Sequence, residues 1–166
     1  DHLNKILHKK SPALLRNIAF PKKKITGNFK AETIAERSRA FEQFLTHIHS
    51  MDSLRVLPEF SDFFYGNDLR EAYQKLSNGA YDEAIQHFKS CLGIQRKLLG
   101  DNHRRVLATL CGLTAASDAL ERYDHAHLFA ESALECLDKG QGGKYAVPLL
   151  VLSIRVCWKL GKEKVD

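Results

Sequence analysis

The chain has 166 residues, of which 44% are hydrophobic, and it carries a formal net charge of +5. This length can bury a real core and allows one domain or two small ones. The longest apolar run, Ala146 to Ile154, is far shorter than the ~20 residues of a membrane span, so we expect a soluble protein. No signal-like or transit-like segment follows Asp1, and we expect the chain to be part of a larger, cytoplasmic protein.

The positive charge is concentrated at one end of the chain. Residues 1–40 contain ten Lys and Arg against three Asp and Glu, a sum of +7, whereas the other 126 residues sum to −2. The four cysteines lie far apart and form no Cys-x-x-Cys pair, which would indicate a metal or redox site. We expect reduced core cysteines, as in cytosolic proteins.

The first elements in chain order are short helices and a basic loop. A helix that begins near Leu3 ends at Ser11-Pro12, because proline lacks a backbone donor and clashes with the preceding turn. A loop with Pro21, three consecutive lysines and Gly27-Asn28 follows, which is turn chemistry beside a dense positive cluster.

A long helix is predicted to resume near Ala31 and to bury one face. The expected members of this face are Ile34, Phe41, Phe44, Leu45 and Ile48. Residues 53–64 then predict a short helical piece around Pro58.

From Leu69 onward the sequence repeats itself with a period of 42 residues. The segment AYQKLSNGAYDEAIQHF (72–88) reads as helix, glycine turn and helix, and Tyr123 and Ala126 repeat the roles of Tyr81 and Ala84. The small residues let paired helices approach closely. The pattern resembles tetratricopeptide hairpins of the long kind found in kinesin light chain, with a third unit from residue 148 whose turn we expect at Gly161. An unrelated helical bundle is the alternative.

The predicted turns lie near Gly79, at residues 100–103, at residues 121–124 and at residues 140–143. Two and a half repeats are barely enough to close a core, so we expect them to pack on the preceding helices. The chain is therefore predicted to be all-α.

Three segments before the repeats resemble the second half of a PX domain: FPKKKITGNF (20–29), ETIAERSRAFEQFLTHI (32–48) and LRVLPEFSDFFYG (54–66). Joined to LREAYQKLSNGAYDEAI (69–85), they resemble the sorting nexins 20 and 21, which have a PX domain followed by a tetratricopeptide-like PX-associated B domain. The resemblance implies domains at residues 1–66 and 67–166. The family's three-stranded sheet and its arginine segment that binds the 3-phosphate would precede Asp1, and with that sheet the PX domain would be α+β.

The resemblance implies an endosomal sorting adaptor on the cytosolic face of early endosomes. Its PX pocket would read a phosphoinositide headgroup, typically phosphatidylinositol 3-phosphate, with Lys23 at the 1-phosphate and Arg37 at the inositol hydroxyls. Lys22 and Lys24 would add attraction to an anionic membrane, or they belong to a solvated loop. Arg39 is expected to be a surface charge, since on a helix it faces away from Arg37.

Other kinds of site find little support in the sequence. Eight histidines include His47-x-His49 and His125-x-His127, but residues i and i+2 on a helix project to different faces, so no metal ligand set is expected. No phosphate loop, nucleophile elbow or catalytic carboxylate pair appears, and we expect neither an enzyme nor a cofactor. A nucleic-acid partner is not expected, because the basic segment is short. A lipid-independent cytosolic scaffold remains open.

The protein partner is expected in the groove lined by the first helix of each hairpin. Aligning the turns places Tyr73, Asp118 and Arg155 on or near this inner face, as an aromatic anchor and one charge of each sign. Such a surface suits an extended peptide, such as the cytosolic tail of a membrane receptor or a segment of another trafficking protein. The alternative is that Tyr73 belongs to the core and that Arg155 is an ordinary surface residue.

Overall fold

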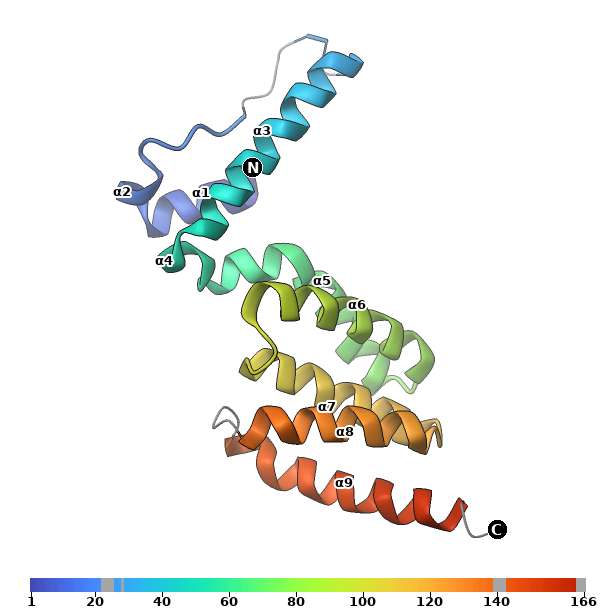
Figure 1. Ribbon diagram of the computed structural model, residues 1–166. Helices are drawn as coiled ribbons and strands as arrows, with labels where there is room; N and C mark the ends of the chain where they lie inside the picture. The colour runs from blue at the N-terminus through green and yellow to red at the C-terminus, as the bar shows by residue number, and fades with distance from the viewer. Residues whose placement is uncertain (22–25, 28, 139–142, 164–166) are drawn as a thin grey trace. The chain divides into compact units, whose positions relative to one another are not determined.

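The computed structural model describes residues 1–21, 26–27, 29–138 and 143–163 of the chain. Within these residues the structure is all-helical and has no strand, which confirms the predicted fold class. The chain divides into two units, residues 1–63 and 64–166, and the division falls inside one helix (Figure 1).

The first unit contains helices α1 (His2–Lys10), α2 (Pro12–Leu15), α3 (Ala31–Ser50) and α4 (Asp52–Arg55), and the beginning of α5 (Pro58–Ser77). Its buried side chains come from every one of these helices: Leu3, Leu7, Leu15, Phe44, Ile48, Leu54 and Phe60. An ion pair of 2.5 Å between the Lys10 ammonium and the Glu59 carboxylate joins α1 to the start of α5.

Two expectations about this unit were wrong. Ile34 is 53% exposed, whereas Thr33 is buried, because the buried face of α3 passes through Thr33 and Phe44, which lie three whole turns apart. Pro58 does not lie inside a short helix. It begins α5, where a missing N–H removes no helical hydrogen bond, and α5 then continues to Ser77.

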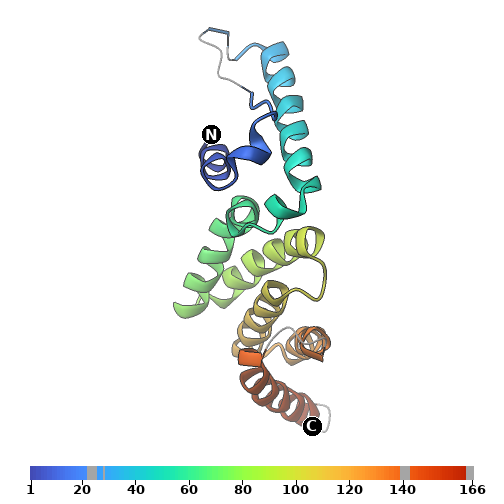
Figure 2. The same cartoon turned by 90° about the vertical axis from the view of Figure 1, so that its left-hand side faces the viewer.

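The second unit contains the rest of α5 and helices α6 (Tyr81–Leu99), α7 (Arg104–Ala119), α8 (Tyr123–Asp138) and α9 (Gly143–Glu163). Helix α7 packs against α6 and α8, and α8 also packs against α9, as Figures 1 and 2 show. Ala84 and Ala126 are fully buried, as the repeat pattern predicted for the close approach of paired helices.

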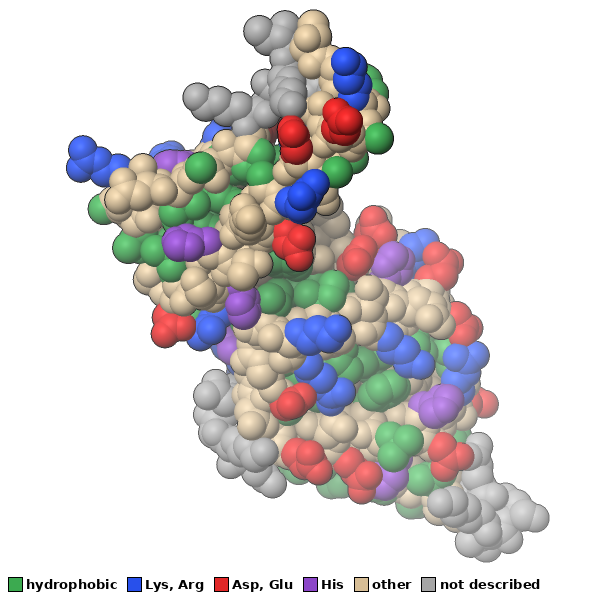
Figure 3. Space-filling view, turned by 45° about the horizontal axis from the view of Figure 1, so that its top comes forward, with side chains coloured by type: hydrophobic (Ala, Val, Ile, Leu, Met, Phe, Trp, Pro, Cys, Tyr) green, Lys and Arg blue, Asp and Glu red, His purple; other side chains and the backbone are tan. Residues whose placement is uncertain are grey.

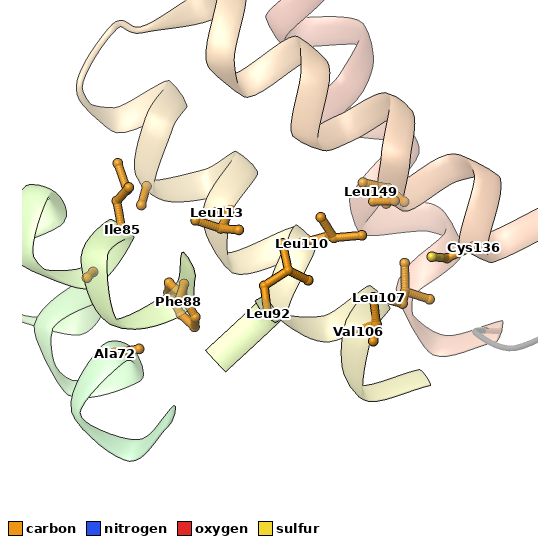
Figure 4. Close-up of a cluster of buried hydrophobic side chains, with 13 residues drawn as sticks. Ala72, Ile85, Phe88, Leu92, Val106, Leu107, Leu110, Leu113, Cys136 and Leu149 are labelled. Atoms are coloured by element: carbon orange, nitrogen blue, oxygen red, sulfur yellow. The ribbon is translucent and has the colours of Figure 1, made fainter. Parts of the chain in front are cut away.

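The core of this unit passes through α7. Figure 4 shows Leu110 and Leu113 of α7 between Phe88 of α6 on one side and Leu149 of α9 on the other. Gly112 makes the approach of α6 and α7 possible, because a Cβ atom at this position would lie 2.6 Å from the Phe88 ring. Any larger residue there requires the buried ring to move.

The predicted turns fall close to their expected places. Gly79 and Gly100 both have positive φ and separate α5 from α6 and α6 from α7. Between α7 and α8 the left-handed residue is Glu121, and the turn is shorter than predicted because Tyr123 already begins α8. Of the fourth turn, residues 140–142 lie outside the described residues, and Gly143 begins α9.

The turn expected at Gly161 was wrong, since α9 continues through it to Glu163. A single glycine inside a helix costs only about 1 kcal/mol, which is not enough to end a helix that has good formers on both sides. Cys91 and Cys136 are buried, as expected for core cysteines, and Cys111 is half-buried, whereas Cys157 is exposed and is not a core residue.

Candidate functional site

Of the residues that the resemblance implies for the phosphoinositide site, Arg37 lies in the part of the chain that the structure describes. It lies on α3, half-buried, with its guanidinium carbon 5.6 Å from the centre of the Phe41 ring. Phe20 packs edge-on against Phe41 and Phe44, with ring centroids 5.5 and 5.1 Å apart. The aromatic cluster therefore holds the Arg37 guanidinium through a cation–π contact with Phe41. Lys22, Lys23 and Lys24 lie outside the described residues.

The residues beyond the lysines include an unusually exposed aromatic side chain. Gly27 adopts a left-handed φ of 74°, Phe29 is 95% exposed, and α3 begins two residues later. An aromatic ring on the surface beside basic residues suits the boundary between headgroups and acyl chains of a membrane.

Tyr73 is held between two helices of the second unit. Its ring packs edge-on against Phe88 at 5.1 Å, and its hydroxyl donates to the carbonyl oxygen of Ala108 on α7 at 3.5 Å. Burial of the hydroxyl raises the pKa of Tyr73 to about 12. The residue as a whole remains 42% exposed, so part of the ring is available to a partner.

Asp118 and Arg155 meet in a cluster that joins α7 to α9. The Arg155 guanidinium donates to the Asp118 carboxylate, which is only 6% exposed, while the Arg155 side chain remains 55% exposed. Lys159 lies 3.7 Å from the same carboxylate and 4.9 Å from the centre of the Tyr123 ring. A hydrogen bond with the Tyr123 side chain, aided by the charge of Asp118, raises the pKa of Lys159.

The three groove residues therefore have different surroundings. Asp118 is almost inaccessible to a ligand, but it orients Arg155, which is accessible. No contact joins Tyr73 to this ion pair among the described interactions. Sequence reasoning missed Lys159, although its spacing of i+4 from Arg155 places it one turn further along the same helix.

A second group of charged side chains, also missed, lies between α5 and α6. The two ring nitrogens of His87 lie 4.0 Å from the Asp68 carboxylate and 3.6 Å from the Glu71 carboxylate. All three have potential metal-ligand atoms within 4.8 Å of one another. A metal ion would bind one imidazole nitrogen, whereas here each nitrogen faces its own carboxylate. The arrangement fits polar contacts that tie α6 to α5 better than a metal site.

The surface shows no dominant basic face in the view of Figure 3, where Lys and Arg side chains are interspersed with Asp and Glu over the described residues. Among the described residues, no helix is both long enough and apolar enough to cross a membrane.

Two family models match the chain, and their order along it is the order of domains that the sequence predicted. Residues 1–67 match the PX domain, and residues 69–139 match the tetratricopeptide repeat. Neither model describes an enzyme family, in agreement with the prediction. No solved structure matches the chain.

Similar proteins extend over the whole chain. Mouse (Mus musculus) sorting nexin-21 is 35% identical over 99% of this chain, and the match covers 46% of that relative. Human (Homo sapiens) sorting nexin-21 is 35% identical over 99% of this chain and 44% of the relative. Bovine (Bos taurus) sorting nexin-20 is 32% identical over 100% of this chain and 52% of the relative.

The chain spans about half the length of the curated relatives it matches. The tetratricopeptide match follows the PX match along the chain, and the described residues after the PX match form helical hairpins. Over its whole length the chain is thus related to sorting nexins 20 and 21.

Proposed function

We propose that the protein is a non-enzymatic endosomal sorting adaptor, cytoplasmic and peripheral on early endosomes. Its PX region binds membranes that contain a phosphoinositide such as phosphatidylinositol 3-phosphate, and its helical repeats bind a protein partner. The observation that carries this proposal is the order of a PX match and a tetratricopeptide match along a whole-chain similarity to sorting nexins 20 and 21.

The lipid half of the proposal depends on Arg37 and the lysine cluster. A phosphorylated headgroup needs cationic donors in fixed positions. Arg37 lies on the aromatic cluster of α3, and we assign Lys23 to the 1-phosphate and Lys22 and Lys24 to the anionic membrane surface. Phe29, 95% exposed, would bury its ring in the membrane boundary beside them.

Vesicle sedimentation of the full-length protein tests the lipid half. We expect binding to vesicles with phosphatidylinositol 3-phosphate, and we expect Lys23→Ala or Arg37→Ala to weaken it by roughly 1.5–3 kcal/mol each, as for a charged hydrogen bond. Arg39→Ala, an exposed change two residues from Arg37, is the matched control and should bind like the wild type.

Two results would contradict the lipid half of this proposal. Equal sedimentation with and without phosphoinositide would favour the alternative of a lipid-independent cytosolic scaffold. Unchanged vesicle affinity in both substituted proteins would remove Lys23 and Arg37 from the site. A duplex DNA arm in the same assay tests the nucleic-acid partner, and we expect no binding there.

The protein half of the proposal places an extended peptide, such as a receptor's cytosolic tail or a segment of another trafficking protein, against Tyr73 and Arg155. Tyr73 offers a partly exposed ring that Phe88 holds in place, and Arg155 offers an exposed guanidinium. Asp118 is a positioning residue in this proposal, because its buried carboxylate orients Arg155 rather than touching the peptide.

Fluorescence polarisation with peptides from the cytosolic tails of endosomal receptors tests this half. We expect the double substitution Tyr73→Ala with Arg155→Ala to abolish binding while circular dichroism shows that the unit keeps its helices. Tyr73→Phe keeps the packed ring and is the control for the hydroxyl. Survival of binding in the double variant, or its unfolding, would show that the residues are structural and that the partner site lies elsewhere.

A further inference from the structure

Helix α9 has apolar side chains on two opposite sides. One side faces the unit's interior and includes Leu149 and Val156, which are 2% and 0% exposed. The other side is open: Val147 is 70% exposed, Leu150 47%, Val151 63%, Ile154 69% and Trp158 61%. We call these five residues the α9 stripe.

The α9 stripe points away from the rest of the unit. Residues two apart in a helix are separated by about 200° of rotation. Ile154 and Trp158, which precede and follow Val156 by two residues, therefore lie nearly opposite it. The stripe residues recur at spacings of three and four, which is the pattern of one continuous helix face. Five large apolar side chains on one face form an interaction surface rather than scattered exposure.

A helix that is apolar on both sides normally lies between two neighbours. Helix α7 provides the internal example, because α6 and α8 pack on it and its buried residues come from all around the helix. Figure 4 shows Leu110 and Leu113 of α7 with partners on two sides. Helix α9 has the sequence character of such a central helix, and its described neighbours, α8 and α7, lie on the buried side.

The charged side chains that α9 itself places beside the stripe are all of one sign, whereas on α8 His127, which contacts Cys157, pairs with Glu131. Lys144, Arg155 and Lys159 follow one edge of it, and the opposite edge carries Ala146 and Cys157. Residues 143–161, the part of α9 with described side chains, contain no carboxylate. Asp118 of α7 neutralises part of this edge, but Arg155 remains 55% exposed.

We propose that the α9 stripe docks an amphipathic helix of a partner protein whose carboxylates lie along one edge. The partner's apolar face would cover Leu150, Ile154 and Trp158, and its acidic edge would pair with Lys144 and Arg155. This inference rests on the proposed protein-binding role of the helical unit, and it places the partner on a surface other than the Tyr73 groove.

The observations favour a partner helix over two other occupants. A second copy of the chain would bring the same residues 143–161, which lack carboxylates, and five residues fall far below the roughly 20–30 a side of a stable dimer interface. A membrane-bound helix has a polar face opposite its apolar one, whereas the face of α9 opposite the stripe is buried in protein. A helix laid into an apolar surface by spaced anchors fits the geometry directly.

The test uses the full-length protein and a designed peptide. The probe is a fluorescein-labelled amphipathic helix with leucines at three- and four-residue spacing and glutamates along one edge. A second peptide carries lysines in place of the glutamates. The protein variants are Ile154→Ser and Trp158→Ala on the stripe, and Leu128→Ser, a matched polar change at an exposed leucine of α8.

We expect the acidic peptide to bind the wild type, with affinity that falls as salt is added. Ile154→Ser and Trp158→Ala should each weaken binding by about tenfold or more, while Leu128→Ser should leave it within about twofold. The lysine peptide should bind at least about tenfold more weakly, since cations would face Lys144 and Arg155. Circular dichroism and melting curves establish that the variants remain folded.

Several results would overturn the proposal. Equal affinity in all variants would show that the stripe is not the docking surface. Loss of binding with Tyr73→Ala but not with Ile154→Ser would move the peptide to the groove and leave the proposed function intact. Concentration-dependent dimerisation that Ile154→Ser abolishes would identify a second copy as the occupant. Sedimentation with phosphatidylserine vesicles that depends on Trp158 would identify a membrane instead.

Discussion

Helices α7 and α9 have the same place in their repeats, and they differ in what surrounds them. Each is the first helix of a unit in the 42-residue pattern, and each is rich in apolar residues on more than one side. Helix α7 buries them between α6 and α8, whereas α9 buries one side and exposes Val147, Val151 and Ile154. The comparison shows that burial is decided by the neighbours that a helix has, and not by its composition.

The largest expected effect lies in α7. Leu113 is fully buried in the core that includes Phe88 and Leu149. Leu113→Ala removes buried methyl groups and leaves a cavity, so we expect a loss of about 2–5 kcal/mol in the free energy of unfolding. Urea denaturation followed by circular dichroism measures this. A loss below about 1 kcal/mol would mean that α7 is not enclosed on both sides.

The next effect concerns the link between the two helices. Asp118 of α7 accepts a charged hydrogen bond from Arg155 of α9, and Asp118→Ala removes it. We expect a loss of about 1.5–3 kcal/mol, because the bond is charge-assisted and the carboxylate is buried. A double-mutant cycle with Arg155→Ala should give a coupling energy of at least about 0.5 kcal/mol. Additive losses in the cycle would show that the pair does not bind α9 to α7.

A smaller effect depends on pH and on the start of α7. The His103 side chain accepts a hydrogen bond from the backbone N–H of Arg105 through Nδ1, at 3.1 Å. Burial, aided by the charges of Arg105 and Arg104, lowers the pKa of His103 from its ordinary value of 6.5. The neutral ring is therefore favoured in the folded state. Its stabilisation is present above about pH 6.5 and is lost as the pH falls through the lowered pKa.

We expect acidification from about pH 7 to pH 5 to destabilise the wild type more than His103→Asn, which keeps a capping acceptor without a titrating ring. Thermal unfolding of both proteins at the two pH values provides the comparison. The same pH dependence in both would mean that the His103 cap contributes nothing.

The smallest effect is expected on the open side of α9. Ile154 is 69% exposed, so Ile154→Ala should change the free energy of unfolding by less than about 0.5 kcal/mol. Val156→Ala, two residues away and fully buried, is the matched contrast and should cost at least about 1 kcal/mol. Similar losses in both variants would mean that the stripe is covered in the free protein.

The repeat made much of the second unit predictable from sequence. Ala84 and Ala126 recur 42 residues apart because both occupy a close contact between helices, and both are fully buried. Gly79 and Gly100 indicated turns because glycine adopts positive φ without strain. Glycine is ambiguous, however: Gly161 continues a helix, and Gly112 permits the close approach of Phe88. Its role depends on neighbours that the local sequence does not show.

The candidate site was less predictable, because it depends on contacts between residues far apart in the chain. Tyr73, Asp118 and Arg155 were placed on an inner face by aligning turns. That alignment gave their helices and positions, but not the ion pair that holds Asp118 and Arg155 together over 37 residues. The open stripe of α9 was also missed, since an exposed apolar face and a buried one have the same periodicity.

Hydrogen exchange with and without the acidic amphipathic peptide tests most directly the claim that α9 is a central helix with one side uncovered. We expect slower amide exchange in α9 on binding, with little change along the rest of the second unit. Slower exchange near Tyr73 and in α7, with α9 unaffected, would contradict it, as would an α9 already as protected as α7 in the free protein.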